Sequence, residues 1–282
     1  MINLLHAGYR RMFHSKLLYF LCSVMFLIVF FYSLALYVLG ISQGGGNGFA
    51  STDNFVLSFP SIALIPTIGM AIYIFGVNLI GKDFEFQTIK NKIIIGNSKI
   101  KIYLVHWILV FSAGMLFYLA YYFGVLTVGM ALVGKPFRLL YAFDVLKLLG
   151  YQVLLVLTYA SVVTSICHIT KNKTVSVILL LVSGVVLMTL GYSIIGRLNE
   201  PEFWKDYETG QLIVNSGYIK PGFLRSLLTF VVHFFPSCSS CYFMLSTGLS
   251  EIPLLEISIY AIVFIVLFSV LGLYIFHRSD LK

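Results

Sequence analysis

Long apolar runs separated by short polar segments fill most of the chain. A hydrocarbon core of about 30 Å needs roughly 20 helical residues at about 1.5 Å each, and six runs satisfy this length. They are residues 17–41, 55–80, 102–133, 148–169, 175–195 and 254–276. This pattern predicts an all-α polytopic membrane protein, with six transmembrane helices forming a single domain over residues 1–282.

The segment before the first run, residues 2–16, has apolar and basic side chains at helical spacing. Tyr9 and Phe13 fall on one side of such a helix, and Arg10 and Arg11 fall on the other. We therefore expect an N-terminal interfacial helix on the membrane surface. A basic anchor that only fixes topology explains the pattern equally well. The first run is too long for a secretory signal and lacks a small-residue cleavage site, so we expect it to remain as a span.

The segment before the last run, residues 226–250, is long enough to cross the membrane, but Pro236 interrupts it. His233, Ser237 and Ser240 make its centre polar. A full crossing would give seven spans and place the C-terminus outside, whereas entry and return on one side gives six. We expect a broken, re-entrant segment of two short helices within an extracellular region, 196–253, because protein or water can cover such backbone at membrane depth.

Composition supports the membrane assignment. The chain is 59% hydrophobic and 11% charged with a mean hydropathy of +0.95, whereas soluble domains carry roughly 25% charged residues. The net charge of +8 comes from basic residues scattered at the ends of apolar runs. A nucleic-acid-binding protein would cluster them along one surface, so we expect the lipid bilayer, and no nucleic acid, as the partner of these charges.

The distribution of charge predicts an orientation. With six spans, one set of loops holds twelve of the 19 Lys and Arg residues but only three of the 11 acidic residues. Basic residues are retained on the cytoplasmic side of a membrane. We therefore expect a multi-pass protein with both termini in the cytoplasm.

The cytoplasmic loop between the second and third spans concentrates charge and has the end signals of a short helix over residues 83–95. Asp83 and Glu85 would stand in its first turn, where the helix dipole favours acids. Gly96 suits a left-handed end, and Ser98 can cap the helix that follows.

Two interpretations of this amphipathic helix remain open. Phe86, Ile89 and Ile93 fall on one side at helical spacing, and lysines fall on the other. The apolar side can rest on lipid, as in many positively charged loops. Alternatively, the helix docks into another protein.

The order of residues in the loop resembles the first cytoplasmic loop of ABC-2 type transporter permeases, which follows G-x-D-F-E-x-G-T and then G-x-S-R with an aliphatic run. The matching positions are Gly81, Asp83, Phe84, Glu85, Thr88, Gly96, Ser98, Lys99 and Tyr103. Gln87 stands where the family usually has Gly, Lys99 where it prefers Arg, and His106 where Lys is common. Residues 276–282 resemble the family's basic F-x-R-x-D-L-K ending.

The resemblance covers nearly the whole chain and implies a function. It implies the permease subunit of a bacterial ATP-binding cassette exporter in the plasma membrane, paired with a second permease copy or a homologous permease and with two ABC ATPase subunits. ATP and magnesium would bind to those ATPases, and this chain would hold no cofactor, metal or catalytic residue. The helix 83–95 would be the cytoplasmic coupling helix. Its contact residues would be Asp83, Phe84, Glu85, Phe86, Thr88 and Ile89.

The rest of the sequence carries little chemistry of its own. Residues 76–82 match a P-loop, but Asp83 replaces the required Ser or Thr and a membrane span precedes it, so we expect no nucleotide site. Cys238 and Cys241 have redox spacing and form a candidate disulfide, with small packing residues as the alternative. The spans contain almost no charge for an ion relay, which disfavours secondary transport.

The resemblance implies export, and a largely apolar bundle would suit an amphipathic or hydrophobic substrate, such as a peptide, a drug or a lipid-like molecule. A membrane sensor or assembly factor that transports nothing is the alternative. An intramembrane enzyme built from His233 and the outer acids is less well supported, because no catalytic motif is present.

Overall fold

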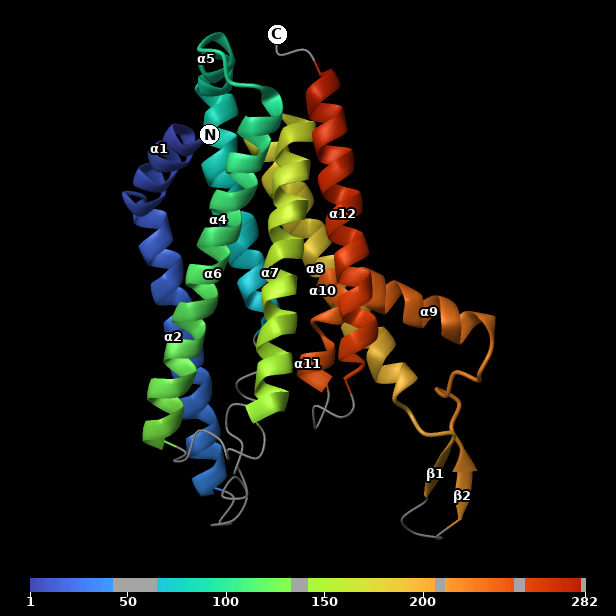
Figure 1. Ribbon diagram of the computed structural model, residues 1–282. Coiled ribbons are helices and arrows are strands. Elements are labelled where there is room, and N and C mark those ends of the chain that lie inside the picture. The colour runs from blue at the N-terminus through green and yellow to red at the C-terminus, as the bar shows by residue number, and fades with distance from the viewer. Residues whose placement is uncertain (43–64, 133–141, 206–210, 246–251, 280–282) are drawn as a thin grey trace.

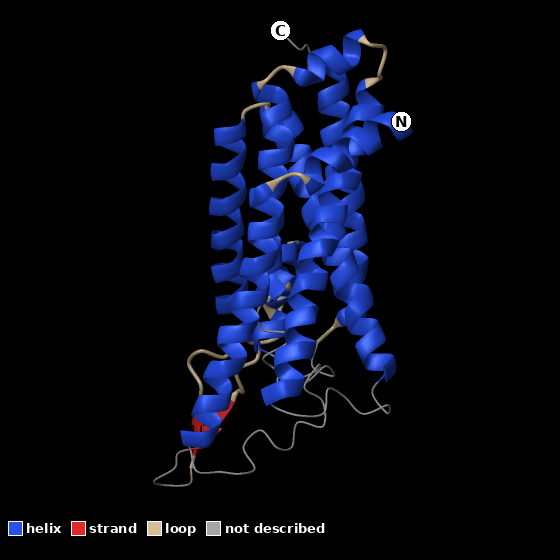
Figure 2. Ribbon diagram, turned by 90° about the vertical axis from the view of Figure 1, so that its left-hand side faces the viewer, coloured by secondary structure: helices blue, strands red, loops and turns tan. Residues whose placement is uncertain are grey.

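Long helices lie alongside one another in a bundle in the computed structural model (Figure 1 and Figure 2). The structure describes residues 1–42, 65–132, 142–205, 211–245 and 252–279. The long helices are α2 (Lys16–Ser42), α4 (Ile65–Glu85), α6 (Lys99–Leu132), α7 (Ala142–Thr170), α8 (Lys173–Leu198) and α12 (Leu254–Arg278).

Five of the described helices are long and apolar enough to cross a membrane, which confirms a mostly helical multi-pass protein. They contain the stretches Lys16–Leu34, Lys99–Val128, Leu146–Thr170, Lys173–Leu198 and Leu254–Arg278. The predicted second span, 55–80, begins outside the described residues. Its described part belongs to α4, which is not among these five helices. Helix α4 continues past the predicted end of the span at residue 80 and ends at Glu85.

Helices α4 and α7 form the interior of the bundle. Helix α4 packs against α6, α7 and α8, and α12 packs along α7. Edge-to-face aromatic pairs join α4 to its neighbours. The ring centroids are 5.7 Å apart for Phe75 of α4 and Phe117 of α6, and 5.4 Å apart for Tyr73 of α4 and Tyr159 of α7. In the apolar stretch of α7, 67% of the residues are buried, against 22% in α8 and in α12. Helices α8 and α12 therefore present apolar faces to the outside.

The N-terminal segment forms the predicted helix, α1 (Ile2–Phe13), which lies against α6 at one end of the bundle (Figure 1). Gly8 and Met12 are its buried residues. The end of α12 lies at the same end of the bundle, where Lys99 Nζ donates to the carbonyls of His277 and Ser279 at 3.0 and 2.8 Å. The first and last long helices therefore share one end.

The predicted helix 83–95 is wrong at its start. Helix α4 runs on to Glu85, and a separate helix, α5 (Thr88–Ile94), follows. Asp83 and Glu85 thus belong to the last turn of one helix, because contacts of Asp83 with other helices outweigh its preference for a helix start. Gln87 separates the two helices with a positive φ of 53°.

The predicted end signals of this segment are confirmed. Gly96 has a φ of +94°, the left-handed conformation that glycine adopts without a steric penalty. Ser98 Oγ accepts a hydrogen bond from the amide of Lys101 at 3.4 Å, as expected of a residue that caps α6.

The far end of the bundle departs from a purely helical fold. Strands β1 (Phe203–Lys205) and β2 (Leu212–Val214) pair antiparallel with Trp204 opposite Ile213. Aromatic and branched side chains favour strands, and the polar stretch around them lacks a helical repeat. The sequence analysis did not predict this hairpin.

The segment before α12 is interrupted at the predicted Pro236, but its described part holds three helices and not the expected two. It contains α9 (Phe223–Phe234), α10 (Pro236–Ser239) and α11 (Tyr242–Leu245), and residues 246–250 lie outside the described part. The break falls at Phe235, because a residue before proline is driven out of the helical conformation. Helix α9 projects sideways from the bundle (Figure 1), and its 12 residues are too few to cross a membrane.

Candidate functional site

The Asp83 carboxylate is the centre of a buried polar cluster at the end of the bundle that carries α1 and α5. Its side chain is 1% exposed. The Arg11 guanidinium contacts both carboxylate oxygens, and Lys92 Nζ donates to Oδ2 at 2.6 Å. His106 Nε2 lies 2.9 Å from Oδ2, and Thr88 Oγ1 donates to Oδ1 at 2.9 Å. One carboxylate therefore joins α1, α4, α5 and α6.

Two histidines extend these contacts into α7. His106 Nδ1 lies 3.2 Å from His168 Nε2, and His168 Nδ1 lies 2.7 Å from the Thr164 carbonyl oxygen. A carbonyl and an ionised carboxylate can only accept hydrogen bonds. The three contacts Asp83–His106, His106–His168 and His168–Thr164 therefore each need one N–H group from an imidazole. Two neutral imidazoles supply two N–H groups, so all three contacts are made only when the pair binds one further proton. We call the joined residues the Asp83 cluster: Arg11, Asp83, Thr88, Lys92, His106 and His168.

Aromatic packing connects the Asp83 cluster to α12. The His168 ring lies 4.5 Å from the Phe276 ring and 5.6 Å from the Phe84 ring, centroid to centroid. Phe276 is fully buried and packs with Ile89 of α5 and Tyr103 of α6. Helix α5 is therefore fixed to the bundle both by ionic hydrogen bonds and by apolar contacts.

Asp83 is ionised although it is buried. It follows the apolar stretch of α4, in the last turn of that helix. Burial by itself would raise the pKa of its carboxyl, but the hydrogen bonds from His106 and Arg11 and the charge of Lys92 lower that pKa well below its usual range. The dipole at a helix C-terminus disfavours a carboxylate, so these partners also offset the dipole.

The six residues predicted to contact an ATPase divide between the inside and the outside of the bundle. Four of them face the bundle or the Asp83 cluster: Asp83, Phe84, Thr88 and Ile89. The other two face outward, with 54% of the Glu85 side chain and 67% of Phe86 exposed. Asp83 and Ile89 are buried and Phe84 and Thr88 are partly buried, so all four help to hold α5 in position. Contact of the six residues with an ATPase stays a prediction.

Sequence reasoning missed two exposed residues of this end. Ile94 and Ile95 are 81% and 80% exposed, just before Gly96. The sequence contains three consecutive isoleucines, Ile93 to Ile95. In a short helix they must lie on more than one face, which could have indicated that some of them are exposed.

Sequence reasoning also missed the pairing of the histidines. His106 stands near the start of the predicted third span and His168 near the end of the fourth. Antiparallel neighbouring spans bring these positions to the same depth, which could have indicated the contact.

The predicted interfacial-helix residues have different environments. Arg11 contacts Asp83, whereas Arg10 is exposed. The Tyr9 hydroxyl lies 2.7 Å from Ser112 Oγ, and Phe13, 46% exposed, stacks on Tyr9. Helix α1 is thus attached to α6 and to the Asp83 cluster.

The two cysteines of the candidate disulfide are free thiols in the structure. Cys238 Sγ donates to the Leu187 carbonyl at 3.0 Å, and Cys241 Sγ donates to the Met188 carbonyl at 3.3 Å. They pack α10 and the turn after it against α8, as expected of small buried residues. The alternative interpretation of this pair therefore fits the structure.

A group of polar side chains lies buried between α6 and α7. Among the described residues, the hydroxyls of Tyr118 and Tyr122 and both amide atoms of Gln152 make no hydrogen bond of regular geometry, although Tyr122 lies beside both Gln152 and Tyr118. The rings of the two tyrosines are 4.8 Å apart. Such groups cost free energy when buried, so they mark a place where the fold does not maximise stability.

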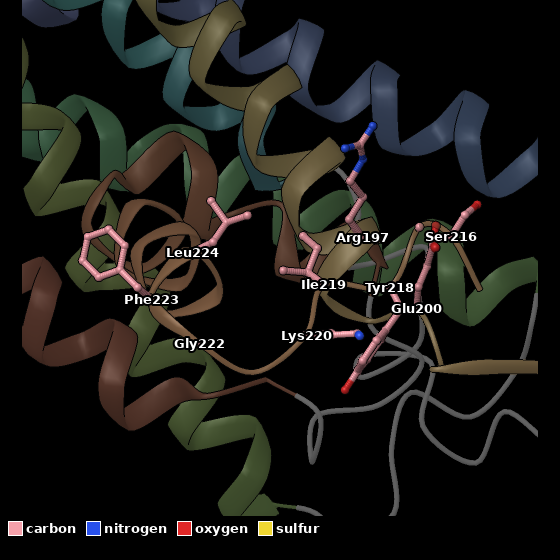
Figure 3. A pocket seen from close by; sticks show the side chains of 10 residues that line it. Arg197, Glu200, Ser216, Tyr218, Ile219, Lys220, Gly222, Phe223 and Leu224 are labelled. Carbon is pink, nitrogen blue, oxygen red and sulfur yellow. The ribbon is translucent and has the colours of Figure 1, made fainter. Parts of the chain in front are cut away.

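A hollow lies at the hairpin end (Figure 3). It has a volume of about 730 Å³ and is lined by Arg197, Glu200, Lys220 and the start of α9. In Figure 3 the Arg197 and Lys220 side chains point in different directions, and Glu200 lies beside them. These charges do not converge on one point, so the hollow is not a defined ligand site.

No protein-family model matches this chain, and no curated protein or solved structure matches it either. The resemblance to ABC-2 type permeases therefore depends on the loop and C-terminal residues quoted above. Within the described ranges, no group of three or more His, Cys, Asp or Glu side chains could hold a metal ion.

Proposed function

We propose that this chain is the transmembrane permease subunit of an ATP-binding cassette exporter of the ABC-2 type. One observation carries the proposal: a short helix at the end of the bundle exposes an apolar edge and is rigidly joined to the helices behind it. The exposed apolar residues are Ile94 and Ile95 at the end of α5 and Phe86 in the turn before it. The Asp83 cluster joins α5 to α1, α4, α6 and α7, so a force on α5 reaches all of them.

The proposed topology has six spans and two cytoplasmic termini. Counting α4 as a span gives six, an even number, which agrees with α2 beginning and α12 ending at one end of the bundle (Figure 1). The positive charge of the loops supports placing that end in the cytoplasm, and the resemblance supports a bacterial cell. Helix α1 would lie at the membrane surface, and the segment α9 to α11 would re-enter from outside.

The proposed assembly contains two permeases and two ABC ATPases. The exposed apolar edge of α5 would enter a groove on the ATPase, and closure of the ATPases on ATP and magnesium would displace α5 and the bundle. Asp83 is the sole buried acid among the described residues, and it is already paired. An interior without unpaired charge suits an amphipathic or hydrophobic cargo, such as a peptide, a drug or a lipid-like molecule.

The test is recovery of an ATPase with the tagged chain from its own membranes. Ile94→Glu with Ile95→Glu should lower the recovered ATPase at least tenfold, because two charges would be buried in an apolar contact. Leu212→Glu with Val214→Glu is the matched control, since these residues are 69% and 70% exposed at the opposite end. Equal recovery from both variants, or no ATPase with the unaltered chain, contradicts the proposal.

A membrane sensor or assembly factor is the second candidate, since the same rigid connection can carry a signal without cargo. The two differ in vesicles that contain the purified complex. A transporter accumulates a labelled amphipathic peptide in an ATP-dependent way, whereas a sensor changes ATPase activity without moving it.

A further inference from the structure

A groove lies beside the Asp83 cluster, between the end of α4 and the start of α8. Its volume is about 520 Å³, and its walls come from the last turn of α4, the turn between α7 and α8, and the first two turns of α8. It lies at the end of the bundle that carries α5. The groove is therefore placed where the bundle would meet the membrane surface.

The polar wall of the groove favours an anion. Lys171 and Lys173 line it, together with Glu85. The ion pair between Lys173 and Glu85 is weak, because Lys173 Nζ and Glu85 Oε2 are 3.5 Å apart and both side chains are substantially exposed. Asn172 Oδ1 caps α8 at this point by accepting from the amide of Val175 at 3.2 Å, so the positive end of the helix dipole also faces the groove.

The opposite wall is apolar and continues down the outside of α8. Val177 and Ile178 line the groove, and Ile178 is 56% exposed. Val182 and Val185, 57% and 52% exposed, follow it at helical spacing. Because α8 is long and apolar enough to cross a membrane, this stripe faces hydrocarbon.

We propose that the groove binds the headgroup of an anionic phospholipid and that one acyl chain of the lipid lies along the stripe on α8. The cations and the helix start would bind the phosphate, and the stripe would bind the chain directly below it. Basic pockets between transmembrane helices bind anionic headgroups in this manner. The inference rests on α8 crossing the membrane and is independent of the proposed transport function.

The first experiment uses native mass spectrometry of the purified chain with equal amounts of phosphatidylglycerol and phosphatidylethanolamine. The unaltered chain should retain phosphatidylglycerol preferentially. Lys171→Gln with Lys173→Gln should reduce that preference roughly tenfold or more, given about fivefold per lysine near a charged surface. Lys205→Gln with Lys220→Gln removes two lysines at the other end and should change nothing. Equal retention of both lipids by the unaltered chain, or equal effects of the two double variants, overturns the proposal.

A second measurement uses the unaltered chain, so it does not depend on the folding of any variant. Phosphatidylglycerol with a photoreactive group in one acyl chain should label α8 between residues 178 and 186. Labelling no greater than that by the matching phosphatidylethanolamine contradicts the proposal.

Two further arms identify the occupant. Glycerol 3-phosphate should not displace the lipid, since it lacks the acyl chain; displacement at equal concentration would identify a free phosphate site and overturn the lipid assignment. If the lysine variants lose a co-purified ATPase but keep the lipid, the groove is a protein contact and the proposal fails. None of these experiments requires an ATPase for lipid binding. A negative result would therefore contradict the lipid site but not the proposed permease function.

Discussion

At the scale of residues, one carboxylate organises the end of the bundle that carries α1 and α5. Asp83 is buried, ionised and contacted by side chains from three other helices. Its surroundings explain both why α4 extends past its apolar stretch and why α5 stays attached. Gln152 is the opposite case, because its buried amide makes no hydrogen bond of regular geometry among the described residues.

Asp83→Asn should lower the free energy of unfolding in detergent. We expect a loss of about 2 kcal/mol, below the roughly 3–5 kcal/mol for breaking a fully buried pair, because solvent reaches Arg11 and Lys92. The measurement is denaturant unfolding of the purified chain. Glu85→Gln is the control and should change little, since its ion pair is long and exposed. Asp83 itself adds no pH dependence between pH 6 and pH 8, because its lowered pKa keeps it ionised at both, so a change of the difference over this range would report protonation of His106 and His168. Similar losses in the two variants would refute the central role of Asp83.

Gln152→Leu should stabilise the protein by up to about 1 kcal/mol, because it replaces a buried amide that makes no hydrogen bond of regular geometry among the described residues. Thr158→Val on the same helix is the control. The Thr158 hydroxyl donates to the Leu154 carbonyl at 2.7 Å, so its loss should be neutral or slightly destabilising. The same unfolding measurement compares them. A destabilised Gln152→Leu variant would show that the amide has a role in folding.

At the scale of elements, the break between α4 and α5 depends on one backbone conformation. Gln87 has a φ of 53° where the ABC-2 pattern usually has Gly. A residue with a side chain costs about 1–2 kcal/mol in this left-handed conformation, which glycine avoids. The backbone therefore accepts Gln in place of Gly at position 87, with some loss of stability.

Gln87→Gly should leave stability unchanged or raise it by up to about 1 kcal/mol, whereas Gln87→Val should lower it, because β-branched residues are poorly accommodated at positive φ. Lys90→Gly, inside α5, should cost about 1 kcal/mol through lost helix propensity. Thermal unfolding of the three variants in one detergent tests this order. A Gln87→Gly variant less stable than Lys90→Gly would show that the conformation at Gln87 is not the strained one.

At the scale of the whole molecule, the bundle has two chemically different ends. One end holds α1, α5 and the Asp83 cluster, and the other holds the β1–β2 hairpin (Figure 1). The charge distribution predicts which end faces the cytoplasm.

Single cysteines in a chain whose four native cysteines are replaced should report this orientation. Ile213→Cys on the hairpin should react with a membrane-impermeant maleimide in intact cells, and Phe86→Cys should react only after permeabilisation. Both native residues are more than half exposed, at 55% and 67%, so access depends on the side of the membrane. The reverse pattern would invert the topology and remove the basis for docking a cytoplasmic ATPase at α5.

The sequence by itself determined the membrane class, most of the long helices, the glycine end after α5, the cap of α6 and the break before Pro236. These features depend on hydrophobic length and on local backbone preferences, which neighbouring residues in the chain specify. Tertiary structure alone decided that Asp83 and Glu85 end α4 and that four of the six predicted contact residues face inward. Those outcomes depend on side chains from different helices, as when Arg11 and Lys92 meet the same carboxylate, and no local pattern encodes such a meeting.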